Sequence, residues 1–177
     1  MSLLFQPLEL RALTLRNRLV VSPMCQYSSD DGFASDWHLV HLGSRAVGGA
    51  ALVIAEATAV EPEGRITPGD LGIWKDEHIE NLSRITKFIK AQGAVPGIQL
   101  AHAGRKASCQ RPWEGGKAIP EAQGGWQTIA PSSIPFNTND PAPRELAQTE
   151  IQQLVKRFSE ATQRALKAVL IHEERDH

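Results

Sequence analysis

Residues 50–55 form a continuous apolar run, Ala-Ala-Leu-Val-Ile-Ala, which ends at the charge of Glu56. A strand with one wet face alternates apolar and polar residues, whereas a parallel strand that is buried on both faces is apolar throughout. Parallel neighbours must be joined by a crossover of a dozen or more residues, usually a helix. This one segment therefore predicts an α/β fold, with helices before and after it in the sequence.

The flanking segments supply the expected strands and helices. Apolar runs at residues 18–22 and 95–100 predict two further strands. One helix, capped by Ser35 or Asp36, is expected to reach Gly48. Its apolar face is formed by Trp37, Val40, His41 and Val47. A second helix, ending before Gly93, places its apolar residues on one clear stripe: Ile79, Leu82, Ile85, Phe88 and Ile89.

The rest of the chain predicts a hairpin, a long loop and a third helix. Residues 3–17 alternate weakly and indicate a small hairpin over one end of the core. Residues 101–145 hold six prolines and no periodic apolar face, which predicts a long loop, and loops of that length are usually functional or disordered. A capping-box pattern at residues 149–152 opens the third helix, and residues 169–171 are expected to begin a fourth strand. The apolar face of the third helix consists of Ile151, Leu154, Val155, Phe158, Ala165 and Leu166.

Composition excludes several classes of protein. Lys and Arg number 19 against 20 Asp and Glu, a formal charge of −1, so nothing favours a nucleic-acid partner. The cysteines, Cys25 and Cys109, are too few for a disulfide framework and are expected to be reduced. No apolar run is long enough for a membrane, and residues 1–7 do not resemble a secretory signal, so a cytoplasmic protein is expected. We interpret residues 1–171 as one domain and residues 172–177 as a polar tail.

Polar residues stand where each predicted strand ends, which is where parallel α/β sheets carry their reactive groups. Residues 22–25 and Tyr27 follow the first strand, residues 56–58 the second, and residues 99–102 the third. Because the carboxyl ends of parallel strands meet at one edge of the sheet, these segments predict one wall of a site. Neither a Gly-x-Gly-x-x-Gly pattern nor a P-loop pattern occurs in the sequence.

Four residues of this wall each fit two roles. Cys25 is either a poised thiol or a small buried hydrophobe, and its chemistry alone favours the second. Tyr27 is a phenolic donor or an aromatic residue on the rim. Gln99, in a strand expected to be buried, needs amide partners from the fold or from a ligand. Ala57 is small enough to let a flat ligand approach the backbone, or serves packing only.

Two other pairs of residues carry weaker signals. His38 and His41 lie three residues apart on a predicted helix, but no carboxylate or cysteine completes a set of ligands, so no metal site is predicted. Arg105 and Lys106 fit either an anion site or a solvated loop.

Several stretches of the chain match one known family in the correct order. They are residues 15–27 (LRNRLVVSPMCQY), 56–60, 62–67, 71–74 and 97–106 (GIQLAHAGRK). Together they resemble the Old Yellow Enzyme family, FMN-dependent ene-reductases that consume NADPH or NADH. Residues 111–113 and 125–131 are similar to the xenobiotic-reductase branch of that family. The family folds as a TIM barrel, which needs roughly 250 residues when complete. The resemblance therefore implies an incomplete, N-terminal half of a (β/α)8 barrel with about three to four βα units.

The resemblance also implies roles for individual residues. Those implied to line the isoalloxazine ring of FMN are Ser22, Pro23, Met24, Cys25, Ala57 and Gln99. Cys25 is implied to lie near the reactive flavin nitrogen and to tune its potential, and Gln99 to bind the polar pyrimidine edge of the ring. Tyr27 is implied to reach the carbonyl of the substrate. In such enzymes reduced FMN delivers a hydride to an α,β-unsaturated carbonyl compound, commonly an enone.

The chain departs from the family after the third helix. The family continues there with a strand, a His-x-x-His motif and a Gly-Tyr pair, whereas here Val169 follows Ala168 directly and His172 has no second histidine three residues on. The phosphate site of this barrel class lies after strands 7 and 8. We therefore expect weak or absent FMN binding by this chain.

Three hypotheses stay open on these grounds. The first is an FMN-dependent oxidoreductase by descent, impaired in the chain as it stands. The second is a catalytically inactive half-barrel that serves as an interaction or assembly module, with exposed strand edges that favour homo-oligomers. The third is a chain that does not fold. Retention of flavin separates the first from the others, and cooperative unfolding separates the second from the third.

Overall fold

A three-stranded parallel sheet forms the centre of the computed structural model, which describes residues 2–170. The strands lie in the order β3 (Val20–Val21), β4 (Leu52–Ala59), β5 (Val95–Ala101), and both pairings are parallel. The outer strands β3 and β5 therefore each present one unpaired edge within the described part of the chain. This sheet confirms the predicted α/β class.

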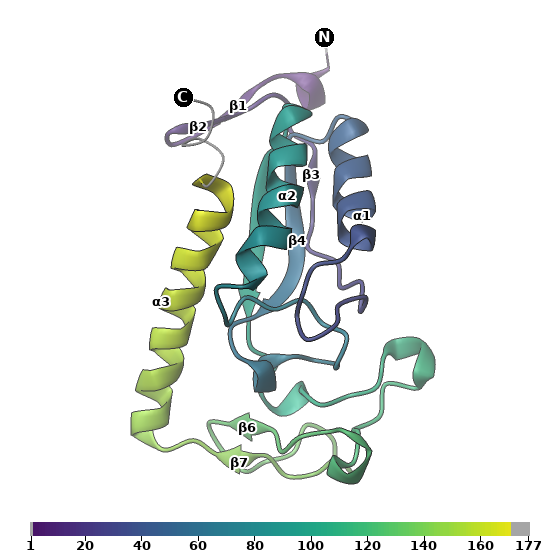
Figure 1. Cartoon of the computed structure of the whole chain (residues 1–177), viewed down its shortest axis with the longest axis vertical. Helices are drawn as coiled ribbons and strands as arrows, with labels where there is room; N and C mark the ends of the chain where they lie inside the picture. Colours follow the sequence, from purple (N-terminus) through teal and green to yellow (C-terminus); the bar gives the residue numbers. More distant parts are fainter. Residues whose placement is uncertain (1, 171–177) are drawn as a thin grey trace.

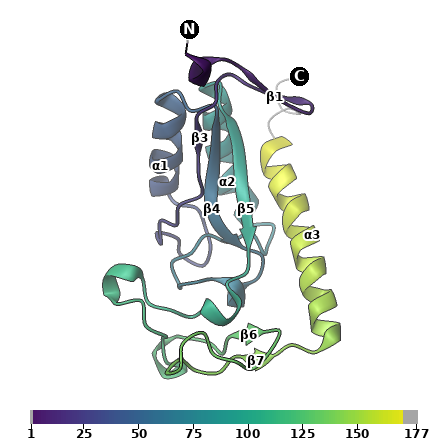
Figure 2. The same ribbon diagram turned by 180° about the vertical axis from the view of Figure 1, so that it is seen from behind.

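The helices are α1 (Asp36–Val47), α2 (His78–Ala91) and α3 (Gln148–Leu170). Helix α2 lies over one face of the sheet, between α1 and α3 (Figure 1). Seen from behind, β4 and β5 lie in front of α2, and none of the described helices covers that side of the sheet (Figure 2). The layout is that of three βα units side by side with one sheet face left open.

Helix α2 confirms its predicted stripe. Ile79, Leu82, Ile85 and Ile89 are buried and pack with Val53 of β4 in the core. Phe88, the fifth member of the stripe, remains 38% exposed. The helix is followed by Gly93 at φ +71°, the left-handed conformation that glycine adopts without strain.

Helix α1 buries His41 as predicted, but the other three residues of its predicted apolar face are exposed. Its buried residues are His38, His41, Leu42, Gly43 and Ala46. Trp37, Val40 and Val47, expected to face the core, are 52%, 59% and 63% exposed. The reason lies in the contact with α2: a Cβ atom at Gly43 would lie 2.9 Å from the Phe88 ring. Small residues bring the two helices together, and the large apolar residues are left outside.

Strand β4 also differs from its prediction. It covers Leu52–Ala59 rather than residues 50–55, and its pairing with β5 shifts between Ala55 and Ala57. Glu56 is the extra residue of this β-bulge, so its side chain leaves the regular alternation. Residues 56–58 consequently lie inside the strand, not after it. Strand β3 is likewise shorter than the predicted residues 18–22.

Helix α3 begins one residue before the predicted capping box. The backbone N–H of Ala147 donates to the Glu150 carboxylate at 2.8 Å, so Glu150 stabilises the start of the helix in place of Thr149. The predicted fourth strand is wrong at Val169 and Leu170, which are the last residues of α3, and Ile171 lies outside the described residues. Of the predicted apolar face, Leu154, Phe158 and Ala165 pack against the core, while Ile151, Val155 and Leu166 are exposed.

The predicted N-terminal hairpin is present. Strands β1 (Leu8–Leu10) and β2 (Leu13–Leu15) pair antiparallel. After them, the Arg16 guanidinium donates to the backbone oxygens of Ala46, Ala50 and Gln92 at 2.7–3.1 Å. These carbonyls lie in the last turn of α1 or just after α1 and α2. Arg16 therefore connects the C-terminal ends of both helices to the hairpin.

The long loop after β5 carries only short elements. They are η3 (Gly104–Lys106), η4 (Pro112–Glu114), η5 (Glu121–Gln123), β6 (Ile129–Ala130) and β7 (Arg144–Glu145). Strands β6 and β7 form a parallel pair, and the loop spreads beneath the carboxyl ends of the sheet (Figure 2). The remaining short turns are η1 (Leu3–Phe5) and η2 (Pro62–Gly64). Among the described residues, no helix has the length and apolar character needed to cross a membrane.

Candidate functional site

The predicted site residues come together at the carboxyl ends of β3, β4 and β5. Ala57 of β4 lies directly opposite Gln99 of β5 in the strand register. The bulge at Glu56 sets this register, because it lets the strand gain one residue before Ala57. The bulge therefore places a small residue and an amide beside each other.

Gln99 is exposed, which corrects the expectation of a buried amide. Strand β5 is an outer strand, and the sheet face away from the helices is open (Figure 2). Within the described residues the side-chain amide of Gln99 makes no hydrogen bond. Its donor and acceptor atoms are thus free to meet a ligand that lies against Ala57.

The segment after β3 forms the neighbouring part of the site. Ser22 and Met24 are exposed, whereas Pro23 and Cys25 are half-buried. Tyr27 has φ +53°, a left-handed conformation that is uncommon for a side-chain-bearing residue. Strain of this kind persists only where the surrounding structure holds it. The segment from Ser22 to Tyr27 is thus held in a defined shape.

Cys25 is a protonated thiol in this environment. Burial raises its pKa to about 11, and the negative charges of Asp70 and Glu56 act in the same direction. The backbone of Ala57 and the Tyr27 hydroxyl lower the pKa of the thiol but do not offset the effect of burial. Since the thiolate is the nucleophilic form of cysteine, Cys25 is not poised for covalent attack at neutral pH.

The Tyr27 phenol also keeps its proton. Burial raises its pKa, and Cys25 and Asp70 add to the effect. The ring packs edge-on against Trp113 of η4, with the ring centroids 5.6 Å apart. Tyr27 can therefore act as a hydrogen-bond donor at the junction between the strand ends and the loop.

The sequence did not predict that two buried carboxylates, Glu56 and Asp70, raise the pKa of Cys25. Glu56 is 3% exposed, and its Oε1 lies 2.9 Å from Nε2 of His38. Asp70 accepts from the backbone N–H groups of Ile66 and Thr67 at 2.8 and 3.2 Å, and from the Thr67 hydroxyl at 2.7 Å. Burial raises the pKa of Asp70. For Asp70, the signal in the sequence was the Thr-x-x-Asp spacing from Thr67, which is typical of such turns.

Of the two histidines of α1, His38 has hydrogen-bonding partners for its ring. Nδ1 of His38 accepts from the Ser35 backbone N–H at 3.0 Å, which leaves Nε2 to donate to Glu56. His41 is buried, and burial lowers its pKa. No group of three His, Cys, Asp or Glu residues within the described chain is arranged to hold a metal ion.

Arg105 and Lys106 brace the loop. Arg105 donates to the Ile134 carbonyl at 2.8 Å and to the Ser132 hydroxyl at 3.1 Å. The Lys106 ammonium lies 4.2 Å from the centre of the Phe136 ring. Arg105 is thus engaged by the loop, whereas Lys106 remains exposed.

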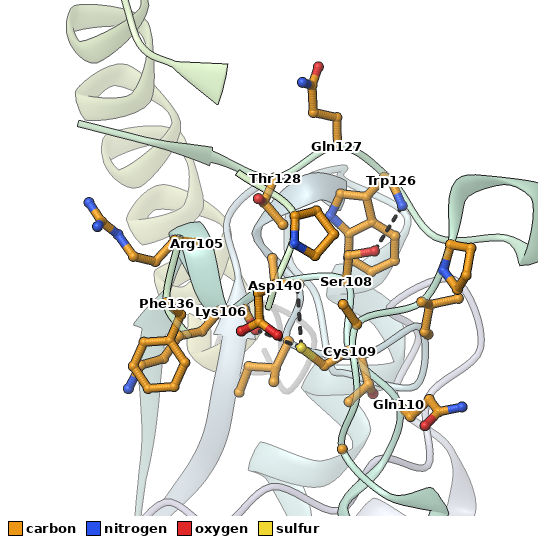
Figure 3. A pocket seen from close by; sticks show the side chains of 18 of the residues that line it. Arg105, Lys106, Ser108, Cys109, Gln110, Trp126, Gln127, Thr128, Phe136 and Asp140 are labelled. Carbon is orange, nitrogen blue, oxygen red and sulfur yellow. Dashed lines mark hydrogen bonds between the residues drawn. The ribbon is translucent and has the colours of Figure 1, made fainter. Parts of the chain in front are cut away.

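The loop lines an open cavity of about 620 Å³, a size usual for small-molecule sites. The side chains of Cys109 and Asp140 lie close to each other in it, and the Trp126 ring lies on the side of Ser108 and Thr128 (Figure 3). Tyr27 also lines this cavity. The cavity therefore extends from the strand ends into the loop.

Comparison with known proteins identifies the lineage. Residues 3–170 match the NADH:flavin oxidoreductase / NADH oxidase family. The chain belongs to this family. An NADPH dehydrogenase from Geobacillus thermodenitrificans is 46% identical over 169 residues, which are 94% of this chain and 45% of that protein. An NADH:flavin oxidoreductase from Gibberella zeae is 46% identical over 168 residues, 93% of this chain and 41% of that protein.

Solved structures of the family share the fold. A morphinone reductase in complex with tetrahydroNAD superposes with a TM-score of 0.79 at 28% identity, over 95% of this chain and 47% of that one. An Old Yellow Enzyme from a Pichia species gives a TM-score of 0.80 at 24% identity, over 95% of this chain and 44% of that one. The chain spans less than half the length of the relatives it matches, and its α/β fold corresponds to the N-terminal part of their barrels. The predicted half-barrel is confirmed.

Proposed function

We propose that this chain carries the flavin-ring side of an FMN-dependent NAD(P)H oxidoreductase that reduces activated C=C bonds, such as those of enones. The observation that carries the proposal is the pairing of Ala57 with the free, exposed amide of Gln99 on an open sheet face. Our proposal includes the xenobiotic-reductase branch of the family, to which residues 111–113 and 125–131 are similar. NADPH is the reductant we favour, because several relatives are named NADPH dehydrogenases.

The residues present fit a flavin ring. A planar ring needs a flat surface without protruding side chains, and Ala57 offers a methyl group there. The ring's pyrimidine edge needs both donors and acceptors, and the Gln99 amide has both types unused. Ser22, which directly follows β3, adds an exposed hydroxyl. The donor set of these strand ends thus suits the ring of FMN.

For the individual residues we propose the roles that the family resemblance implies. Ser22, Pro23, Met24 and Cys25 would line the ring, with the Cys25 thiol in its protonated form. Tyr27, a phenol held in its protonated form, donates a hydrogen bond to the substrate carbonyl from the mouth of the loop cavity. FMN, when bound, supplies the hydride chemistry. The protein's part is to bind, to orient and to hold a proton at the Tyr27 hydroxyl.

A flavin titration with matched variants tests this proposal. Perturbation of the visible absorbance and quenching of the fluorescence of FMN measure binding to the wild-type chain, to Gln99→Ala and to Gln152→Ala, an exposed amide on α3. Loss of one hydrogen bond predicts about fivefold weaker binding for Gln99→Ala and no change for Gln152→Ala. Equal affinity of all three proteins contradicts the proposal.

One observation favours a second candidate, an assembly module without catalysis. Both outer strands of the sheet lack a neighbour on one side among the described residues, and Val20 of β3 is 48% exposed. Unpaired edges are templates for pairing with another chain. A chain that binds no flavin at any concentration, yet unfolds cooperatively and self-associates, favours this candidate over the oxidoreductase.

A further inference from the structure

Glu56 connects the sheet to the segment that carries Cys25 and Tyr27. One oxygen of its carboxylate, Oε2, accepts a hydrogen bond from the backbone N–H of Gln26. Gln26 lies between Cys25 and Tyr27 in the chain. The β-bulge directs the Glu56 side chain out of the ladder and makes this contact possible.

The other carboxylate oxygen is fixed by α1. Oε1 of Glu56 accepts from Nε2 of His38 at 2.9 Å, and both side chains are at most 3% exposed. Nδ1 of His38 accepts from the backbone N–H of Ser35, the residue that caps α1. The chain of contacts runs from the start of α1 through His38 and Glu56 to Gln26. Every donor in it faces an acceptor, so the Glu56 carboxylate has one defined position.

We propose that Glu56 is a positioning residue, which holds the backbone between Cys25 and Tyr27 so that the thiol and the phenol face the site. The statement that the thiol and the phenol face a flavin site rests on the proposed function. The positioning of the backbone by Glu56 does not depend on it. The left-handed conformation of Tyr27 supports it, since such a conformation needs an external restraint. The side chain of Gln26 adds a weaker restraint by accepting a hydrogen bond from the Trp37 indole at 3.0 Å.

The reactivity of the Cys25 thiol reports this positioning. The charged or titratable groups around Cys25 are Asp70, Glu56 and Tyr27, and burial is the first cause of its raised pKa. If Glu56 releases the segment, Cys25 gains water, and its pKa falls toward the ordinary value. The change is measured by the rate of reaction with 5,5′-dithiobis(2-nitrobenzoate) as a function of pH. The background is Cys109→Ser, which leaves Cys25 as the single cysteine of the chain.

Two substitutions separate position from charge. Glu56→Gln removes the charge and turns an amide N–H₂ toward one of the two donors, Gln26 or His38. Glu56→Asp keeps the charge but is one methylene too short to reach both partners. Positioning predicts that both variants lower the pKa of Cys25 by about one unit and raise the reaction rate near pH 8 about tenfold. Glu63→Gln, an exposed carboxylate on η2, is expected to match the background.

The outcomes are distinct. If the pH dependence of the Cys25 reaction rate in Glu56→Asp equals that of the wild type, the proposal is overturned. The loss of charge alone then accounts for any effect of Glu56→Gln. Circular dichroism identifies a variant that does not fold, and if Glu56→Gln fails to fold, the Glu56→Asp profile decides. Flavin titration of the same proteins tests the proposed function separately: a chain without flavin affinity whose Cys25 profile shifts in both variants retains the positioning role.

Discussion

His38 and Glu56 face each other in the interior, with Nε2 of the histidine 2.9 Å from Oε1 of the glutamate. Their side chains are 1% and 3% exposed. Removing one partner of such a buried pair leaves an uncompensated charge or donor in a medium that solvates it poorly. This pair joins α1 to the bulge of β4, and so links the helical layer to the strand ends.

We expect His38→Ala to lower the free energy of unfolding by about 3 kcal/mol, because the Glu56 carboxylate is then buried without its partner. Arg84→Ala is the matched control, since Arg84 pairs with Asp36 at 2.6 Å in an exposed position. Surface pairs contribute roughly 0–1 kcal/mol. Urea unfolding of both variants measures the difference, and equal losses contradict the account.

The chain is expected to lose stability in mild acid. His78 is fully buried, its ring lies edge-on to Phe33 and Trp74, and burial lowers its pKa. Below the ordinary histidine pKa the unfolded chain protonates His78, whereas the folded chain keeps it neutral. The contribution of neutral His78 to the free energy of unfolding is therefore complete above that pKa and declines as pH falls below it. Urea unfolding at about pH 7.5 and about pH 5.5 is expected to show the decline. For His78→Gln we predict a smaller change in the free energy of unfolding between the two pH values. An unchanged pH dependence in this variant would contradict the role given to His78.

Gly69 is expected not to tolerate a side chain. A Cβ atom there would lie 2.6 Å from the backbone oxygen of Tyr27, which cannot move without the site segment. We predict that Gly69→Ala costs about 2 kcal/mol. At Gly97 the nearest atom to an added Cβ belongs to the Ile54 side chain, 3.3 Å away. Gly97→Ala is therefore the milder control in thermal unfolding, and an equal loss in both variants refutes the argument.

The outer strand β3 predicts self-association. Val20 is 48% exposed on β3, and a lysine on an edge strand opposes pairing with another chain. Sedimentation velocity over a range of concentrations is expected to show association that Val20→Lys reduces. Val47→Lys, at a 63% exposed position on α1, is the control. If both variants reduce association alike, general charge rather than the strand edge is the cause.

The sequence predicted those features that follow from periodicity. The α2 stripe around Leu82 and Ile85 is buried as expected, because a 3.6-residue period can bury only one face. The burial of α1 was in large part mispredicted, because the contact of Gly43 with Phe88 depends on the approach of two helices and not on apolar character. Local patterns do not contain such tertiary choices.

The candidate site was predictable as a set but not in its details. The strand-end rule brought Ala57 and Gln99 together, and the register confirms that they are neighbours. The exposure of Gln99 depends on what covers the sheet, which strand composition does not reveal. The role of Glu56 depends on a bulge, and a single charged residue after an apolar run predicts the end of a strand equally well.

The most direct test of the flavin-ring proposal compares riboflavin with FMN on the 177-residue chain. The contacts offered by Ala57, Gln99 and the segment after β3 suit the ring, so the account predicts that the two flavins bind with dissociation constants within about threefold of each other. Equilibrium titration of flavin fluorescence measures both. Binding of FMN alone would contradict the claim that these strand ends recognise the ring, and absence of binding by both flavins would favour the assembly module over the oxidoreductase.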